Sequence, residues 1–371
     1  MNSMLKKTIL VLGIETSCDD TSIAIIRGEV GATDRRPTIL AAQSFSQETL
    51  LRKWGGVVPE IAARNHTLKL TPLLEQCFQD SALKPAQIDL IGVTTHPGLL
   101  GPLLTGLNHA KTLALFFEKP ILPVNHLYAH LEAIHLTNPI SYPYLGLLVS
   151  GGHSLFTLVT SAQEFSILGS TLDDAAGEAF DKAGKLMGLG YPAGRIIDQL
   201  AKEGDPHKYK FPIGLQRSAD TMMSFSGVKT SMRSFLEKNP SFIHTRAEKA
   251  QDESFSQEIK DLSASYQHAI VSALTLKTKY ALKKAAAMGH ANIPIVLGGG
   301  VACNSYLRKE LQRLFPSVYC VEPQFCTDNG AMIANYALRT ASLKVDFPGC
   351  LKMDARGRFV DKAYGRKSDR Q

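Results

Sequence analysis

The chain has no long apolar run and no paired cysteines. None of its apolar stretches reaches the eighteen or so residues that a membrane-spanning helix needs. The first stretch, residues 8–14, turns polar at Glu15 without the small-residue cleavage site of a signal peptide and is expected to form a strand. The six cysteines include no CxxC pair, which favours reduced thiols. We therefore expect a cytoplasmic protein that does not enter a membrane.

Three common motifs of catalysis and nucleotide binding are also missing. Leu127 follows His126 where an HExxH metalloprotease has its glutamate, which disfavours zinc proteolysis of that kind. Residues 227–230, GVKT, lack the spacing of a P-loop, and no GxGxxG follows the first predicted strand. Any nucleotide would therefore have to be bound by other loops.

The positive charge of the chain is unevenly distributed. The formal net charge is +7, but the segment from Leu351 onward holds seven Lys or Arg and three Asp, which amounts to +4. The remainder is close to neutral, so charge alone does not indicate nucleic acid or membrane. The basic end is either a flexible arm or an ordinary solvated terminus.

The order of predicted elements indicates an α/β protein of two lobes. At 371 residues the chain exceeds the size at which a single core remains efficient. Hairpins are predicted near residues 8–26 and 144–160, the second with glycines at its apex, and helices near 59–83, 103–118 and 257–288. We expect lobe I over residues 1–124, completed by about 330–345. Lobe II is expected over 125–329 with an insertion at about 202–257, and a basic tail over 346–371.

A pair of histidines carries the clearest sign of metal chemistry. His126 and His130 are four residues apart, so on a helix they project from one face at a separation that suits one divalent ion. A surface helix that happens to carry two histidines is the alternative. His135, five residues further, points elsewhere and is expected to be structural or exposed.

A third ligand has to come from distant sequence. Asp328, in the segment CTDNG, is the best candidate because a carboxylate in a loop with glycine can approach an ion closely. On its own an aspartate at this position more often caps the helix, which here begins at Gly330. The spacing alone leaves both roles open.

Glycine loops and a small-residue helix form a second group of candidates. Residues 150–152 and 298–300 expose backbone N–H groups, which suits a phosphate or a nucleoside, although ordinary turns also use glycine. Asp181 belongs to a helical acidic stripe that is either solvated or close to a ligand. Asn304 suits either a hydrogen bond to a nucleoside or a helix N-cap.

Nine motifs, taken together and in order, resemble the universal tRNA threonylcarbamoyladenosine transferase family, formerly called the O-sialoglycoprotein endopeptidase or glycoprotease family. The resemblance extends over about residues 9–341. The motifs are GIETSCDDT, GGVVPEIAAR, PGLLGPLLTG, HLYAH, LLVSGGHS, DDAAGEAFDK, SFSGVKT, LGGGVACN and CTDNGAMIA.

The resemblance implies a fold of the actin, Hsp70 and sugar-kinase type, with two duplicated lobes that each contain a mixed five-stranded sheet flanked by helices. It implies transfer of the threonylcarbamoyl group from threonylcarbamoyl-AMP to N6 of the adenosine 3′ of the anticodon in tRNAs that read ANN codons. It also implies two partner proteins, a catalytically inert paralogue in a heterodimer and a P-loop ATPase.

Site residues follow from the same resemblance. The metal ligands are His126, His130 and Asp328, and the ion is Fe²⁺, with Zn²⁺ as the alternative. The substrate-binding residues are Leu148, Val149, Ser150, Gly151, Gly152, Asp181, Gly194, Asp198 and Asn304. No general base is assigned, and Asp19 and Asp20 are the candidates.

The chain departs from the family pattern at several positions, one of which, serine for threonine at Ser154, keeps a hydroxyl. Asp20 stands where glutamate is usual, and Ala193 and Arg195 replace a glycine and a proline in the turn after Tyr191. Each change could alter the activity. A metalloprotease, an Hsp70-like nucleotide-binding module and a sugar kinase are the rival functions, and metal analysis separates the first two because an Hsp70-like module has no use for the histidine pair.

Overall fold

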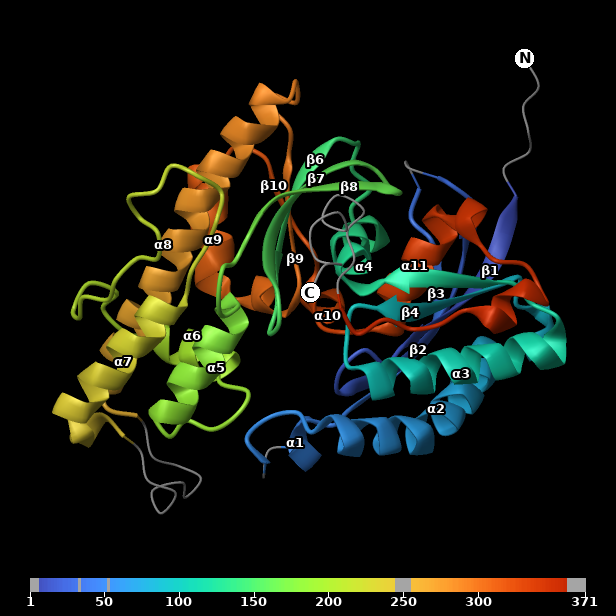
Figure 1. The fold of residues 1–371 in the computed structure, drawn as a ribbon, viewed down its shortest axis with the longest axis horizontal. Helices are drawn as coiled ribbons and strands as arrows, with labels where there is room; N and C mark the ends of the chain where they lie inside the picture. The colour runs from blue at the N-terminus through green and yellow to red at the C-terminus, as the bar shows by residue number, and fades with distance from the viewer. Residues whose placement is uncertain (1–6, 33–34, 52–53, 244–254, 359–371) are drawn as a thin grey trace, which may run out of the picture. The chain divides into compact units, whose positions relative to one another are not determined.

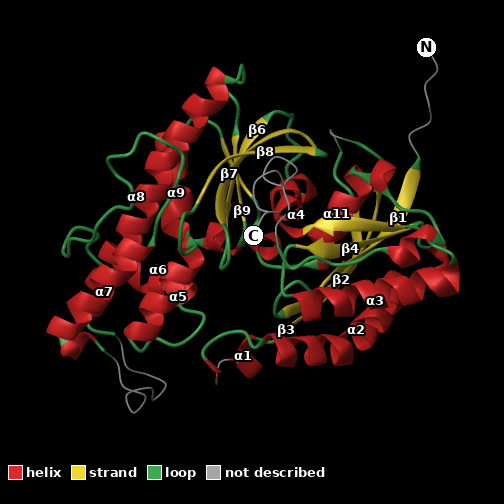
Figure 2. Ribbon diagram, viewed as in Figure 1, coloured by secondary structure: helices red, strands yellow, loops and turns green. Residues whose placement is uncertain are grey.

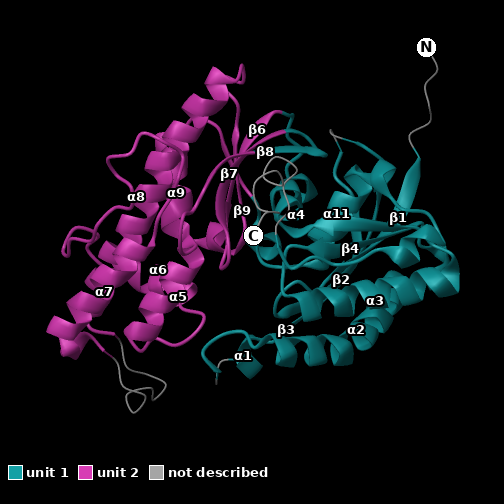
Figure 3. Ribbon diagram, in the orientation of Figure 1, with its two compact units in different colours: residues 1–142, 160–166, 321–371 teal, residues 143–159, 167–320 magenta. Residues whose placement is uncertain are grey.

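The computed structural model describes residues 7–32, 35–51, 54–243 and 255–358. The chain forms two compact units (Figure 3). Unit 1 comprises residues 1–142, 160–166 and 321–371, and unit 2 comprises 143–159 and 167–320. The sequence placed the boundary after residue 124, whereas the chain divides after Tyr142. The reason is that the helix following residue 125 packs against a helix of unit 1.

A mixed five-stranded sheet forms the centre of unit 1 (Figure 1). Its order is β3-β2-β1-β4-β5. β1 is antiparallel to β2 and parallel to β4, which is parallel to β5. The strands are β1 (Thr8–Glu15), β2 (Asp20–Glu29), β3 (Thr38–Ser46), β4 (Leu90–His96) and β5 (Ile121–Asn125).

Helices cover both faces of this sheet. Side chains of β1 and β2 share one apolar core with α2 (Pro59–Ser81) and α3 (Leu100–Phe117). On the other face, α11 (Gly330–Arg339) packs against β1, β2 and β4. A Cβ at Gly13 would lie 2.2 Å from the Gly330 carbonyl oxygen, so this glycine allows α11 to touch the strand. The short helices are α1 (Glu48–Leu51), α4 (His126–Glu132) and α10 (Pro323–Cys326).

Unit 2 contains the second mixed sheet, in the order β10-β9-β6-β7-β8. β6 is antiparallel to β7 and parallel to β9, and β9 is parallel to β10. The strands are β6 (Tyr144–Val149), β7 (Ser154–Ser161), β8 (Glu164–Ser170), β9 (Ile295–Gly298) and β10 (Val318–Cys320). The helices are α5 (Ala176–Leu186), α6 (Gly194–Ala201), α7 (Ser226–Lys238), α8 (Gln257–Ala287) and α9 (Ser305–Leu314).

The predicted hairpins and long helices are present, and the predicted fold class of two five-stranded mixed sheets flanked by helices is confirmed (Figure 2). β3, β8 and β10 were not predicted. Within the predicted insertion at 202–257 the described residues include α7, and residues 244–254 lie outside the description. Among the described residues no helix is both long and apolar enough to cross a membrane.

The start of the predicted basic tail packs against unit 1. The Arg356 amide donates to the Thr95 carbonyl at 2.8 Å, and the Gly98 amide donates to the Gly357 carbonyl at 3.2 Å. Cys350 is fully buried in the unit 1 core. Residues 346–358 are therefore part of the fold, because their backbone supplies hydrogen-bond partners to the end of β4 and the loop after it. Residues 359–371 lie outside the described part of the chain.

Candidate functional site

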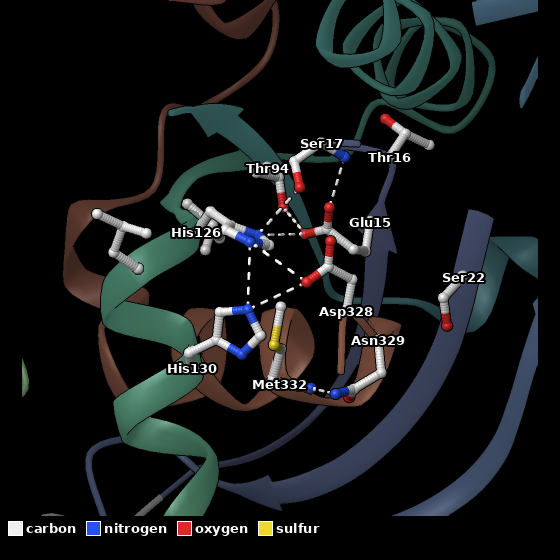
Figure 4. A network of polar contacts seen from close by, with 12 residues as sticks. Glu15, Thr16, Ser17, Ser22, Thr94, His126, His130, Asp328, Asn329 and Met332 are labelled. Carbon is white, nitrogen blue, oxygen red and sulfur yellow. Dashed lines mark hydrogen bonds and ion pairs between the residues drawn. The ribbon is translucent and has the colours of Figure 1, made fainter. Parts of the chain in front are cut away.

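The two candidate histidine ligands occupy the short helix α4, which begins where β5 ends. The Asn125 side chain caps this helix by accepting from the Leu127 amide at 2.9 Å. His126 is the first residue of α4 and His130 the fifth, so both rings project from one face (Figure 4). Their exposed fractions are 8% and 1%. The alternative of a solvated surface helix is thereby excluded.

Asp328 meets both histidines at a single point. His130 Nε2 lies 3.1 Å from Asp328 Oδ1 and 3.2 Å from His126 Nε2, and His126 Nε2 lies 3.4 Å from Asp328 Oδ1. These three atoms form the one group of three or more potential metal ligands of the His, Cys, Asp and Glu type within the described residues. The cap of α11 is instead Asn329, whose Oδ1 accepts from the Met332 amide at 2.8 Å. Asp328 is therefore not the N-cap.

A buried polar network joins α4 to α11. Arg339 Nε donates to Glu132 Oε2 at 2.8 Å, and Asn335 Nδ2 donates to the Glu132 backbone carbonyl at 2.8 Å. Tyr142 also donates to Glu132 Oε2, at 2.7 Å. Glu132 is completely buried, and its carboxylate is compensated by the guanidinium of Arg339. The network holds the histidine helix beside the helix that follows Asp328.

Glu15, a residue that the sequence interpretation passed over, contacts the other side of His126. His126 Nδ1 lies 3.2 Å from Glu15 Oε2 and 3.2 Å from Ser17 Oγ. The Ser17 amide donates to Glu15 Oε1 at 2.5 Å, and the Thr94 hydroxyl donates to Glu15 Oε2. One sequence feature could have identified Glu15: it is a glutamate directly at the end of an apolar strand. A charged residue is rarely buried there unless it has a partner.

The electrostatics of the group suit a cation. Burial raises the pKa of Glu15 and of Asp328, but the neighbouring His126 outweighs burial and holds both pKa values below their usual range. Burial and the charge of His126 lower the pKa of His130, which stays neutral. Burial lowers the pKa of His126, but Asp328 and Glu15 hold this pKa well above its usual range, so a charged His126 partly compensates the two ionised carboxylates. A cation bound between these residues would take over that compensation. Nitrogen and carboxylate donors fit a divalent transition metal.

Asp19 and Asp20, the candidate bases, lie at the turn between β1 and β2. Burial and the charge of Asp328 raise the pKa of both, that of Asp20 to about 7. Asp20 Oδ1 is buried and has no hydrogen-bond partner within the described residues. A carboxyl group with this pKa can take up or release a proton near neutral pH.

The glycine loops of unit 2 lie at the ends of the parallel strands β6 and β9. Leu148 and Val149 are fully buried in β6. A Cβ at Gly151 or Gly152 would meet no atom within 4 Å. Gly299 has a φ of +90°, and its Cβ would lie 2.5 Å from the Val149 carbonyl oxygen. The two loops therefore meet at the carboxyl ends of β6 and β9.

The remaining predicted substrate residues hold the backbone around these loops. Asp181 Oδ1 accepts from the Ala193 amide at 2.8 Å, next to Gly194 at the start of α6. Asp198 accepts from the Ser305 amide at 3.2 Å and from the Ser305 hydroxyl at 3.0 Å. Asn304 caps α9 by accepting from the Leu307 amide at 2.8 Å, and its amide donates to Gln267 Oε1 at 2.6 Å. The capping role that the sequence left open for Asn304 is confirmed.

Comparison with known proteins agrees with this organisation. The family described as tRNA N6-adenosine threonylcarbamoyltransferase matches residues 38–335. Proteins of that name from Geotalea uraniireducens (strain Rf4) and Thermosipho africanus (strain TCF52B) are 42% and 44% identical to this chain. Each alignment covers 88% of this chain, and they cover 90% and 92% of the two relatives.

Among solved structures, full-length HypF in its phosphate- and nucleotide-bound form superposes with a TM-score of 0.55 at 13% identity. The match covers 91% of this chain and 56% of HypF. At this identity the likeness concerns the fold alone, which is of the actin, Hsp70 and sugar-kinase type. By the extent and identity of the sequence matches, the chain is a transferase of tRNA modification and belongs to the tRNA N6-adenosine threonylcarbamoyltransferase family.

Proposed function

We propose that this protein transfers the threonylcarbamoyl group from threonylcarbamoyl-AMP to N6 of the adenosine 3′ of the anticodon in tRNAs that read ANN codons, releasing AMP. The observation that carries the proposal is the convergence of His126, His130 and Asp328 in a chain of this family. Sequence spacing predicted the histidine pair, and the fold brings a carboxylate to it from a distant segment.

The chemistry explains why such a site is useful. The exocyclic amine of adenine is a poor nucleophile because its lone pair is delocalised into the ring. The enzyme therefore has to place the amine close to the carbamoyl carbon, and the adenylate provides a good leaving group. In the proposal His126, His130 and Asp328 hold Fe²⁺, or Zn²⁺ as the alternative. When bound, the ion supplies a Lewis acid for the threonylcarbamoyl oxygens.

Unit 2 supplies the proposed binding residues for the adenylate. Free space beside Gly151 and Gly152 supports an approach of phosphate to the backbone amides of these two glycines. The Ser150 amide donates to the His153 carbonyl at 2.8 Å and therefore helps to shape the loop. Asp181 and Asp198 accept from the backbone amides of Ala193 and Ser305, so their proposed contribution includes the shape of this site. Leu148, Val149, Gly194 and Asn304 complete the proposed set.

Asp20 is the better supported of the two candidate bases. Without a metal ion, burial and the charge of Asp328 raise its pKa to about 7, and its buried Oδ1 has no partner within the described residues. A cation held by Asp328 would oppose this rise and enlarge the ionised fraction at neutral pH. In the proposal this carboxylate accepts the proton that N6 loses. Asp20→Asn would then lower the transfer rate strongly and leave metal content unchanged, and full activity of this variant would exclude the role.

Family membership supports a proposal for the partners. We propose that the protein acts on tRNA in the cytoplasm, with an inert paralogue as heterodimer partner and a P-loop ATPase. The target adenosine has to leave its stack in the anticodon loop to react.

One reconstitution experiment tests the function. The protein, with and without its two partners, is incubated with threonylcarbamoyl-AMP and unmodified tRNA, and the modified nucleoside is measured by mass. Replacing both His126 and His130 by alanine should abolish metal content and product while the fold is retained. His290→Ala in unit 2 is the matched control and should retain both.

Three results would contradict the proposal. Full activity of metal-free protein would remove the role of the histidines. Peptide cleavage that depends on the same histidines would favour a metalloprotease, and nucleotide binding without metal or transfer would favour an Hsp70-like module.

A further inference from the structure

Glu15 is a fully buried carboxylate whose oxygens are surrounded by donors. It is the last residue of β1, and its exposed fraction is 0%. Oε1 accepts from the Ser17 amide, and Oε2 accepts from the Thr94 hydroxyl and lies 3.2 Å from His126 Nδ1. The two protein donors come from the loop after β1 and from the parallel neighbour β4. These two hydrogen bonds fix the position of the carboxylate independently of its contact with His126.

We infer that Glu15 is a positioning residue for the metal centre, which acts through His126. By accepting the Nδ1–H of His126 it selects the tautomer in which the Nε2 lone pair is free and faces Asp328 and His130. A carboxylate paired with a ligand histidine in this way orients the ring and makes the nitrogen a stronger donor. The inference rests on the metal site of the proposed function and extends it by one residue.

The two histidines differ in this respect. His130 Nδ1 is buried and has no hydrogen-bond partner within the described residues, whereas His126 Nδ1 has the carboxylate. Only His126 is therefore oriented through its second nitrogen by a charged group, and Glu15 should influence metal binding through His126 alone.

A merely structural role is the alternative. Glu15 also satisfies the Ser17 amide and the Thr94 hydroxyl, so its removal destabilises the loop whether or not a metal binds. Metal affinity and its dependence on His126 separate the two roles, because a structural contribution does not vanish when His126 is replaced.

The test is a Co²⁺ titration of the full-length, metal-free protein, followed by the visible absorption of the bound ion and repeated with Zn²⁺ in competition. Glu15→Gln keeps the shape of the side chain and removes its charge. Glu15→Asp keeps the charge and shortens the side chain by one methylene. Both should weaken Co²⁺ binding roughly 10- to 100-fold, the usual cost of losing such a partner.

Two further variants provide the controls. Asp261→Asn removes another buried carboxylate that accepts a backbone amide, in unit 2, and should leave Co²⁺ affinity unchanged. In a His126→Ala background, measured at millimolar Co²⁺, Glu15→Gln should produce no additional loss. Circular dichroism and thermal unfolding report whether each variant is folded.

Co²⁺ affinity of Glu15→Gln within twofold of the parent would overturn the inference, as would an equal loss in the His126→Ala background. If Glu15→Gln fails to fold, Glu15→Asp decides by the same criteria. Failure of the parent protein to bind Co²⁺, or its indifference to His126→Ala, would instead refute the metal site of the proposed function.

Discussion

His135 lies five residues after His130, and its surroundings give it properties unlike those of the candidate ligands. It is fully buried, and its Nε2 lies 3.7 Å from Glu132 Oε2. Burial lowers the pKa of His135 to about 4, although the charge of Glu132 opposes the shift. Of the two roles expected for His135, structural or exposed, the structural one is confirmed.

The lowered pKa of His135 predicts a loss of stability in mild acid. The unfolded chain protonates this histidine near pH 6.5 but the folded protein only near pH 4, so the free energy of unfolding falls as pH decreases between these values. The full contribution is about 3 kcal/mol. Calorimetry of parent and His135→Gln between pH 7 and pH 4 measures it. The variant should show the shallower pH dependence, and equal slopes would contradict the assignment.

At the scale of elements, the closeness of α11 to β1 places Asp328. A Cβ on Gly13 would lie 2.2 Å from the Gly330 carbonyl oxygen and 2.6 Å from the Ala334 amide nitrogen. We predict that Gly13→Ala pushes α11 away, costs about 1–3 kcal/mol or more of stability and lowers metal affinity. Gly227→Ala is the matched control, because its Cβ meets nothing within 4 Å. Thermal unfolding and a Co²⁺ titration measure both effects, and normal affinity in a folded Gly13→Ala protein would contradict the argument.

Asn304 has two candidate roles, the N-cap of α9 and a contact with the substrate, and two variants separate them. Asn304→Ala removes the acceptor for the Leu307 amide and should cost about 1 kcal/mol. Asn304→Ser restores an acceptor and should recover part of that stability. If the serine variant is stable but its KM for threonylcarbamoyl-AMP rises, a substrate contact exists besides the cap. Parent-like kinetics of the serine variant would exclude a substrate contact and leave Asn304 with structural roles alone.

At the scale of the whole molecule, all the proposed metal ligands belong to unit 1. A ligand that binds only the folded state stabilises it, by about 2.7 kcal/mol at a concentration of 100 Kd. Chelation should therefore reduce the hydrogen-exchange protection of α4 and α11 and leave α8 and α9 of unit 2 unchanged. His126→Ala should remove the response, and equal loss of protection in both units would contradict it.

Much of the fold could be predicted because its signals are local. Alternating and apolar runs marked β1, β2, β6 and β7, and helical periodicity marked α2, α3 and α8. The strands that were missed are outer strands of the two sheets. β10 has only three residues, and β3 exposes polar residues along its length. Edge strands of this kind bury too little apolar surface to leave a clear pattern.

The sequence by itself determined what depends on neighbours along the chain: the histidine pair four residues apart, the glycine loops and the order of strands and helices. The family resemblance named Asp328 as the third ligand, but only the tertiary structure placed it, 198 residues after His130, beside both histidines. The tertiary structure also decided that Glu15 lies behind His126. The physical reason is that these contacts depend on how closely α11 packs on β1 and on the end of the sheet at which α4 begins. The spacing of residues along the chain encodes neither the packing distance nor this position.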